Sequence, residues 1–340
     1  IYGHMCKVLP DFDGTTLRTN GHVTLDGKNL HDFVMYEILD IRLLLLKRLY
    51  HKNLIGWSAQ KRLEEIVIKI ISDAVDATGI TDVAFSGGVF LNMIMNMKIQ
   101  QKFGKKLNLF FNPICNDLGN SVGAALEQCY QETGKNPVQP YMSLYLGNSY
   151  SDEEVVADSK KFNFKITKVN KVDTAIDLIE RGKVIGWFQG RAEFGARGLG
   201  NRSILSLATE QKYKDVVNEK VKKREAWRPF CPTIIEEKSE EMLENSTYAP
   251  YMILGFEMKN PELYPAVCHV DGTTRPQILK KGTNPDFYQV VKGVGGIVLN
   301  TSFNLAGDPV VETPYDALMT LKNSEMDAVI INDFMVEKNK

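Results

Sequence analysis

A short apolar strand that runs through a glycine turn into a helix is the pattern that most constrains this chain. Residues Asp82–Phe85 are predicted to form the strand and Ser86–Val89 the turn, with a helix from Leu91 onward. A second strand is predicted at Asn108–Asn112, and a helix that opens on small residues follows it. Successive strand–helix units of this kind predict a mixed α/β domain.

Helical periodicity precedes this pattern over residues 31–51 and again over residues 58–78. In the second segment the apolar residues fall on one helical face, Ser58 is the predicted N-cap and Gly79 the predicted C-cap. Residues 1–30 are rich in Gly, Asp, Thr and Asn, and we expect them to form loop or a short hairpin.

The second half of the chain repeats the α/β alternation. The stretch Gly134–Tyr141, with a glycine, an asparagine and two prolines, is the predicted linker, so domains are expected at residues 1–138 and 139–340. The later elements are expected as helices at Asp173–Arg181, Gln211–Lys223 and Pro314–Asn323, and as strands at Val184–Phe188, Gly296–Leu299 and Ala328–Ile331.

Composition excludes several classes of protein. The chain of 340 residues carries 41 basic and 42 acidic residues, and this balance does not favour nucleic acid as the main partner. Its five dispersed cysteines include no CxxC pair, which argues against a disulfide framework and a cysteine zinc site and favours a reducing cytoplasm. No apolar run approaches the ~20 residues that cross a bilayer. The chain starts with Ile and shows no signal-peptide pattern, so we expect it to begin inside a longer protein.

The stretch from Gly190 to Arg202 is the most informative part of the sequence, because it interleaves three arginines with four glycines. Arginine presents a planar, permanently charged fork that matches phosphate and carbonyl oxygens. Glycines allow such a loop to fold tightly around a small anion. A solvated charged loop does not usually carry so many glycines among its arginines, so an anion site is the favoured interpretation.

Two later stretches also place polar side chains. In Trp227–Phe230 an arginine lies between aromatic residues and beside a rigid proline, which indicates that its side chain is held in a defined position. The lysines that precede it could simply complement the dipole at the C-terminal end of a helix. Asn300, Ser302 and Asn304 alternate after an apolar strand, so on an extended chain they point to one side. This row fits a ligand site at a strand end. It fits a polar turn with self-satisfied Asx hydrogen bonds about as well.

Two loops in the first half each allow two interpretations. Gly87 and Gly88 lie between a strand and a helix, where free N–H groups suit a phosphate, but for so short a motif a plain turn is favoured. Asp117 lies in a polar loop before a helix of small residues, where a carboxylate ligates a metal or caps the helix, and capping is favoured on the residues alone.

Several common motifs are absent. The sequence has no GxxxxGK[ST] phosphate loop, no strand-linked GxGxxG, no GxSxG elbow and no HExxH. Its five histidines include no pair at helical ligand spacing, so the chain alone shows no obvious complete metal site.

Taken together and in this order, these segments resemble the NodU/CmcH carbamoyltransferase family. The resemblance runs from about Phe85 to the C-terminus. Its most specific stretches are Gly190–Ile204, Val221–Phe230, His269–Gln277 and Leu299–Asn304.

The resemblance implies an α/β protein of two domains. Residues 1–138 would be the C-terminal part of an actin-like ATPase (ASKHA) domain, similar to the tRNA threonylcarbamoyl-transfer protein, and residues 139–340 a YrdC-like α/β domain. It implies an ATP-dependent O-carbamoyltransferase of the cytoplasm. The YrdC-like domain would join carbamoyl phosphate to ATP, giving carbamoyl adenylate and pyrophosphate. In the actin-like domain the hydroxyl of a small-molecule acceptor would then attack the carbamoyl carbon, and AMP would leave. No membrane or nucleic-acid partner is expected, and a homodimer is compatible with this scheme.

The resemblance also implies roles for individual residues. Four match the family's residues around carbamoyl phosphate and ATP and are the predicted catalytic groups: Arg197, Lys222, Arg228 and Arg275. Four are weaker matches for the same site: Arg202, Asn300, Ser302 and Asn304. Three match the nucleotide-binding glycine motif: Gly87, Gly88 and Asn92. Asp117 matches the family's metal-ligating aspartate, for iron or magnesium, which reverses the preference for a cap.

One departure from the family pattern matters. The family's His-x-x-x-His metal motif and first phosphate loop lie upstream and do not occur here. The transfer step is therefore expected to be strongly impaired, while the YrdC-like half still makes the adenylate.

Two other classes of protein stay open. One is a tRNA-modifying enzyme of the threonylcarbamoyl type, against which the near-neutral charge and the arginine motifs count. The other is a non-catalytic nucleotide-binding or interaction fragment.

Overall fold

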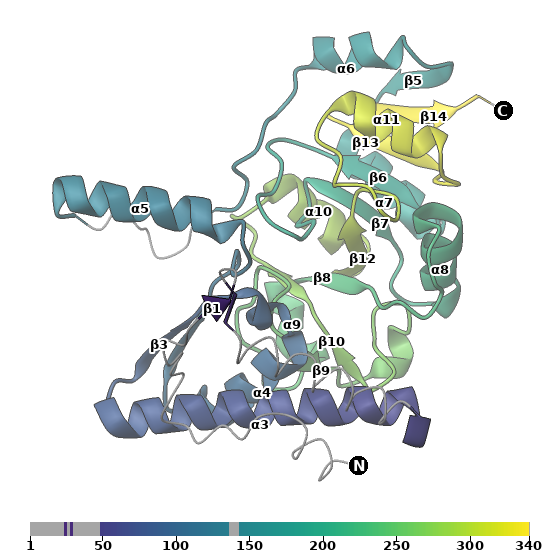
Figure 1. Cartoon of the computed structure of the whole chain (residues 1–340). Helices are drawn as coiled ribbons and strands as arrows, with labels where there is room; N and C mark the ends of the chain where they lie inside the picture. Colours follow the sequence, from purple (N-terminus) through teal and green to yellow (C-terminus); the bar gives the residue numbers. More distant parts are fainter. Residues whose placement is uncertain (1–23, 26–27, 30–47, 136–142, 340) are drawn as a thin grey trace. The chain divides into compact units, whose positions relative to one another are not determined.

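The computed structural model describes residues 24–25, 28–29, 48–135 and 143–339, and the described chain forms two compact units (Figure 1). The first unit holds the described residues up to Ala84 together with Lys98–Phe110. The second holds Phe85–Met97 and the described residues from Phe111 onward. Most of the predicted linker lies outside the described residues, so the domain boundary near residue 138 stays a prediction.

The helix α3, Lys52–Thr78, is the longest element described. It begins six residues before the predicted start, because His51 caps it by accepting a hydrogen bond from the N–H of Asn53. The prediction that Ser58 is the N-cap is wrong, since Ser58 lies buried inside the helix. Gly79 closes the helix in the left-handed conformation, as predicted.

The predicted strand–helix–strand pattern is confirmed after α3. The strand β3, Asp82–Phe85, pairs with β4, Asn108–Phe111, and the helix α4, Met93–Phe103, lies between them in the sequence. The short strands β1, Thr24–Leu25, and β2, Lys28–Asn29, pair antiparallel, as expected of a hairpin. The predicted helix over residues 31–51 lies almost wholly outside the described residues.

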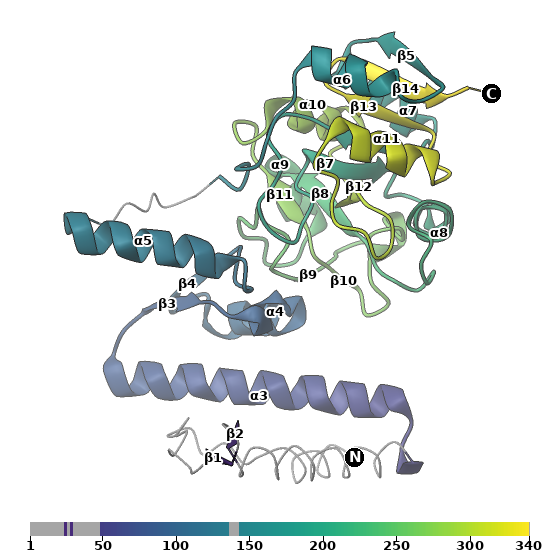
Figure 2. The ribbon, with the colours of Figure 1, turned by 45° about the horizontal axis from the view of Figure 1, so that its top comes forward.

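An eight-stranded mixed sheet organises the second unit (Figure 2). Its strands follow the order β11-β8-β12-β7-β6-β13-β14-β5, in which the pairs β11–β8 and β13–β6 are parallel and the other pairs antiparallel. The bounds are β5 Phe164–Lys168, β6 Ile185–Phe188, β7 Arg202–Ser206, β8 Cys231–Ile235, β11 Gln277–Leu279, β12 Ile297–Ser302, β13 Ala328–Ile331 and β14 Phe334–Lys338.

Helices cover both faces of this sheet. The helices α6, Asp152–Ser159, and α11, Pro314–Lys322, pack with one apolar cluster, and α7, Lys171–Glu180, and α10, Pro285–Gly293, pack with the other. Along β6 the side chain of Trp187 belongs to the α7–α10 side, and the next residue, Phe188, to the α6–α11 side. Central strands buried on both faces are apolar throughout, which is why β6 and β13 were predictable from sequence.

No described helix is both long enough and apolar enough to span a membrane.

The second unit also contains elements outside the large sheet and the four helices that cover it. These elements are α5 Gly119–Thr133, α8 Gln211–Val216, a π-helical turn Val217–Lys222, α9 Glu236–Met242, β9 Phe256–Glu257, β10 Thr273–Thr274 and two 3₁₀ turns, Gly88–Leu91 and Pro261–Leu263.

The predicted helix over Gln211–Lys223 changes to a π-helical turn after Val216. Its widened geometry lets the backbone oxygen of Asn218 accept hydrogen bonds from the N–H groups of both Lys223 and Arg224. Lys223 ends the turn with a left-handed φ of 52°. Single π turns of this kind are rare and often occur at functional sites.

Replacing Gly200 with alanine is expected to destabilise the second unit. Gly200 has a φ of +105°, and a Cβ there would lie 2.1 Å from Cδ1 of Phe287, which is fully buried. Backbone strain and overpacking together predict a loss of about 2–4 kcal/mol in the free energy of unfolding. Urea denaturation measures this loss. The control is Gly282→Ala, where a Cβ meets nothing within 4 Å, and an equal effect of the two changes would contradict the prediction.

Candidate active site

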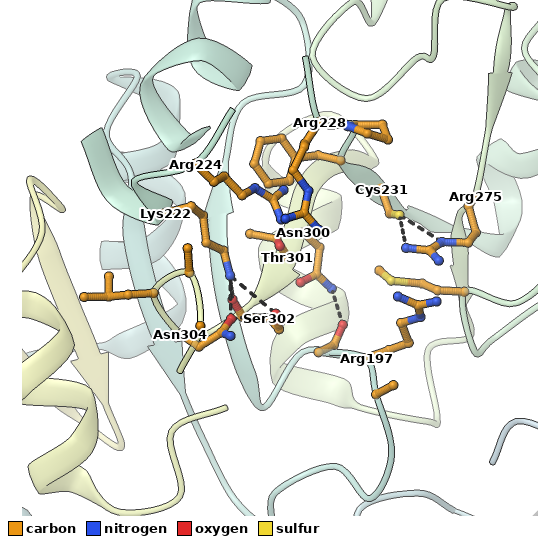
Figure 3. Close-up of a pocket in the computed structure, with 18 residues that line it drawn as sticks. Arg197, Lys222, Arg224, Arg228, Cys231, Arg275, Asn300, Thr301, Ser302 and Asn304 are labelled. Atoms are coloured by element: carbon orange, nitrogen blue, oxygen red, sulfur yellow. Dashed lines mark hydrogen bonds between the residues drawn. The ribbon is translucent and has the colours of Figure 1, made fainter. Parts of the chain in front are cut away.

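A cavity of about 450 Å³ opens in the second unit, and its wall is strongly positive. Among the described residues, five basic side chains line it and no acidic one does. Figure 3 shows these cations in two groups, with Asn300 between them. The five are Lys222, Arg224 and Arg228 in one group and Arg197 and Arg275 in the other.

Lys222 ends the π-helical turn and is almost completely buried. Its Nζ donates hydrogen bonds to the carbonyl oxygen of Ser302 at 2.5 Å and to Oδ1 of Asn304 at 2.6 Å. Burial, followed by the charges of Arg224 and Arg228, lowers the pKa of Lys222 to about 7. The amine therefore changes charge near neutral pH when the cavity is empty, and a bound anion would favour its protonated form.

Asn218 holds the loop that carries the two arginines of this group. Its side-chain N–H₂ donates to the carbonyl oxygens of Ala226 and Arg228 at 3.1 and 2.9 Å, and its Oδ1 accepts from Nε of Arg224 at 2.7 Å. The Arg224 guanidinium also lies 4.7 Å from the ring centre of Phe230. One buried amide thus fixes Arg224 and the backbone of Arg228, while the Arg228 side chain stays exposed at the cavity mouth.

Arg197 and Arg275 form the second group. Arg275 donates from Nε and Nη2 to Sγ of Cys231 at 3.2 and 3.0 Å. The buried Nε of Arg197 has no hydrogen-bond partner among the described residues. Burial and the nearby charge of Arg275 lower the pKa of Arg197 to about 10. A half-buried guanidinium with a buried, unused Nε donor and a like-charged neighbour is suited to bind an anion.

Asn300, Ser302 and Asn304, at and after the end of β12, all line the cavity, and so does Thr301 between them. Asn300 donates to Oγ1 of Thr233 at 2.9 Å, and its buried Oδ1 has no partner among the described residues. Ser302 donates from Oγ to Oδ1 of Asn304 at 2.8 Å. β12 is longer than predicted and includes Ser302, so the strand itself presents part of this row.

Arg202, a predicted site residue, does not line the cavity. It is fully buried and donates to the backbone carbonyls of Gln189, Gly190, Asn201 and Asn148, and its guanidinium lies 3.5 Å from the ring centre of Phe188. Both Nη atoms thus donate to the protein's own backbone, while the buried Nε has no hydrogen-bond partner among the described residues, so the structure gives Arg202 a supporting role in the arginine–glycine loop.

Glu193 supports the same loop and was not predicted. Its Oε1 accepts hydrogen bonds from the N–H groups of Leu199 at 2.6 Å, Asn201 at 2.7 Å and Arg202 at 3.2 Å. Burial raises the pKa of Glu193, and the three N–H donors oppose that shift. The carboxylate therefore shapes the turn that brings Arg197 to the cavity.

The predicted glycine motif and metal ligand lie elsewhere in this unit. Gly87 and Gly88 are exposed, a Cβ at either would meet nothing within 4 Å, and neither they nor Asn92 line the cavity. Asp117 is exposed in the turn before α5. Within the described ranges no three His, Cys, Asp or Glu side chains are arranged to hold a metal ion, so these residues do not form a complete metal site.

Some of the residues that line the cavity were not predicted from the sequence. Arg224 belongs to the Val221–Phe230 stretch but was not singled out, because a spacing of two residues from Lys222 does not predict a shared helical face. Cys231 and Thr301 carried no signal of their own, because a single cysteine or threonine beside a strand has no specific spacing.

Both parts of the chain match models of a known family. The model described as carbamoyltransferase N-terminus matches residues 14–126, and the model described as carbamoyltransferase C-terminus matches residues 176–338, which contain every cavity-lining residue. A solved structure of full-length HypF, in its phosphate- and nucleotide-bound form, is 15% identical with a TM-score of 0.39, and covers 52% of this chain and 23% of that one. That likeness is too weak to identify the fold of the second unit.

Curated relatives match most of the chain. The nodulation protein NolO of Bradyrhizobium diazoefficiens is 33% identical over 295 residues, which are 83% of this chain and 54% of NolO. The 3'-hydroxymethylcephem-O-carbamoyltransferase of Streptomyces clavuligerus is 30% identical over 259 residues, which are 74% of this chain and 48% of that enzyme. The chain thus spans about half the length of these relatives. On these matches, this chain belongs to the NodU/CmcH carbamoyltransferase family.

Proposed function

We propose that this chain carries the part of an ATP-dependent O-carbamoyltransferase that binds carbamoyl phosphate and ATP and forms carbamoyl adenylate. The observation that carries the proposal is the cavity, whose lining in the described part of the chain has five basic side chains and no acidic one. Its volume of about 450 Å³ lies within the range of small-molecule sites. Membership of the carbamoyltransferase family supports the carbamoyl group as the group transferred.

The two groups of cations suggest how two phosphorylated ligands share the site. Lys222, Arg224 and Arg228 would hold the phosphates of ATP, and Arg197 and Arg275 the phosphate of carbamoyl phosphate. Preorganised positive charge stabilises the charge that develops on phosphoryl oxygens in the transition state. Asn300, between the groups, offers a buried amide with an unused oxygen that would orient the carbamoyl amine.

The phosphorus balance constrains what to measure. Carbamoyl phosphate and ATP together contain four phosphorus atoms, and carbamoyl adenylate keeps one. Pyrophosphate accounts for two more, so the fourth must leave as inorganic phosphate. An assay should therefore find phosphate and pyrophosphate released in equal amounts. The acceptor in the second step would be a small molecule with a hydroxyl group, which is the chemistry that the name of the cephem relative gives for that enzyme.

The test is carbamoyl-phosphate-dependent release of pyrophosphate from ATP by the purified chain. Arg197→Ala and Arg228→Ala are each expected to reduce this release by at least about a hundredfold, because each removes a charge-stabilising contact. The matched control is Arg181→Ala, at the C-terminal end of α7, where the side chain is 69% exposed and pairs with Asp177.

Other results would count against the proposal. No release from a folded chain that binds ATP would favour a nucleotide-binding fragment. Release that needs threonine and bicarbonate instead of carbamoyl phosphate would favour the threonylcarbamoyl alternative.

A further inference from the structure

We propose that Thr233 and Gln277 make the cavity selective for a phosphate whose acyl group carries an N–H₂, because they hold the Asn300 side chain so that it offers its oxygen to the ligand. The proposal rests on the proposed function for the identity of the ligand, and adds the residues that distinguish a carbamoyl group from an acetyl group. Neither Thr233 nor Gln277 is among the described residues that line the cavity, so both act through Asn300 as positioning residues.

A chain of buried hydrogen bonds begins at the arginine–glycine loop. Nε2 of Gln277 donates to the carbonyl oxygen of Leu199 at 2.9 Å. A carbonyl oxygen only accepts hydrogen bonds, so this contact fixes which end of the Gln277 amide faces the loop. The other end, Oε1, accepts the O–H of Thr233 at 2.8 Å. A threonine hydroxyl has one hydrogen to donate, so the Thr233 oxygen can only accept from its next partner.

That partner is the side-chain N–H₂ of Asn300, which donates to Oγ1 of Thr233 at 2.9 Å. The same N–H₂ donates to the Gly198 carbonyl oxygen at 3.2 Å, and has a longer contact of 3.4 Å to Oε1 of Gln277. If the Asn300 amide turned over, its oxygen would face the Gly198 carbonyl oxygen and two acceptors would meet. The nitrogen therefore stays on the side of these acceptors, and Oδ1 is the end left for the cavity.

Burial makes this orientation matter for binding. The side chains of Thr233, Gln277 and Asn300 are all buried, and Oδ1 of Asn300 has no hydrogen-bond partner among the described residues. Figure 3 shows Asn300 on the cavity wall between the two groups of cations. A ligand that brings an N–H to this oxygen satisfies it, and a ligand without a donor leaves a buried acceptor unpaired.

The acyl group of the ligand decides which case applies. Carbamoyl phosphate carries an N–H₂ beside its carbonyl group, whereas acetyl phosphate carries a methyl group of similar size in the same place. Only the N–H₂ donates to Oδ1 of Asn300. Sites built to pair with a donor reject analogues that lack it, so the carbamoyl group is expected to be favoured at least about tenfold.

The experiment is titration calorimetry of the full chain with two stable phosphonates, in which a CH₂ group replaces the labile bridging oxygen. Phosphonoacetamide carries the N–H₂, and 2-oxopropylphosphonate carries the methyl group. The unmodified chain is expected to bind the amide at least about tenfold more tightly than the ketone. Equal affinities, or no binding of the amide, would overturn the proposal, and this result depends on no variant.

Gln277→Met tests the chain of hydrogen bonds. Without Oε1 to accept it, the Thr233 hydroxyl is free to donate to Asn300, so the amide is no longer held in one orientation. The Leu199 carbonyl oxygen keeps a donor, because it also accepts from the hydroxyl of Tyr145 at 2.9 Å. The preference for the amide is expected to fall to less than about threefold, through weaker binding of the amide alone.

The binding of the ketone separates positioning from a general structural role, because a damaged cavity would bind both phosphonates less well. The matched control is Gln189→Met, which also removes a buried amide that donates to backbone carbonyls, those of Ile330 and Asn332, and should keep the preference. An unchanged preference in Gln277→Met, or an equal loss for both phosphonates, would refute the proposal. These titrations need no ATP. Pyrophosphate release by a chain without the preference would refute this inference and leave the proposed function in place.

Discussion

Lys222→Met is expected to weaken ATP binding at pH 7 by at least tenfold and to remove most of its dependence on pH. The lost contact is a charge-assisted hydrogen bond in a buried site, which contributes about 1.5–3 kcal/mol. Methionine keeps much of the volume and fits the apolar part of the lysine stem. The loss should therefore reflect charge and not a collapse of the cavity.

The pH dependence has a definite sign in the unmodified chain. The pKa of Lys222 is about 7 in the empty cavity, and a bound phosphate raises it. Binding then takes up a proton, so affinity is greatest below pH 7 and falls by up to about tenfold per pH unit as pH rises above it. Between pH 7.5 and 9 the phosphate groups are already ionised, since their second pKa is near 6.

Titration calorimetry with ATP across that range measures the effect. In buffers of different ionisation enthalpy the same titrations also count the protons taken up. Lys222→Arg is the matched control, because arginine stays charged and should bind with little pH dependence. An unmodified chain whose affinity is flat from pH 7.5 to 9 would show that Lys222 does not titrate in the empty cavity.

The two arginines at the end of the arginine–glycine loop are expected to affect stability in opposite directions. Arg202→Met should lower the free energy of unfolding by about 3–5 kcal/mol, because four backbone carbonyls lose a buried charged donor. Arg197→Met should raise it by about 1–2 kcal/mol, because it removes a half-buried charge that lies beside the like-charged Arg275. Only Arg197→Met should abolish pyrophosphate release while leaving the chain fully folded.

Urea denaturation of both variants beside the unmodified chain gives the two values. The opposite signs are informative, since both residues are arginines of one loop replaced by one residue. If Arg197→Met destabilised the chain as much as Arg202→Met, Arg197 would be a structural residue and its place in the proposed site would be lost.

Sequence reasoning predicted the parts of the fold that carry strong local signals. The strands β3 and β13 were predicted with their observed bounds, because each is a short apolar run between turn residues. The strands β7, β8 and β11 were not predicted. β7 begins with Arg202, β8 contains Pro232, and β11 is three residues long, so only pairing within the large sheet makes them strands.

The sequence by itself, through its resemblance to a known family, determined many of the residues that line the cavity. Seven residues matched by motif, from four separate stretches, line one cavity: Arg197, Lys222, Arg228, Arg275, Asn300, Ser302 and Asn304. Only the tertiary structure decided how each one is used. Arg202 and Arg197 have the same side chain, stand five residues apart, and each has a buried Nε without a hydrogen-bond partner among the described residues. Yet the Nη atoms of Arg202 donate to backbone carbonyls, whereas Arg197 lines the cavity. The physical reason is that a charged donor's role depends on the acceptors around it, and those come from segments far away in the sequence.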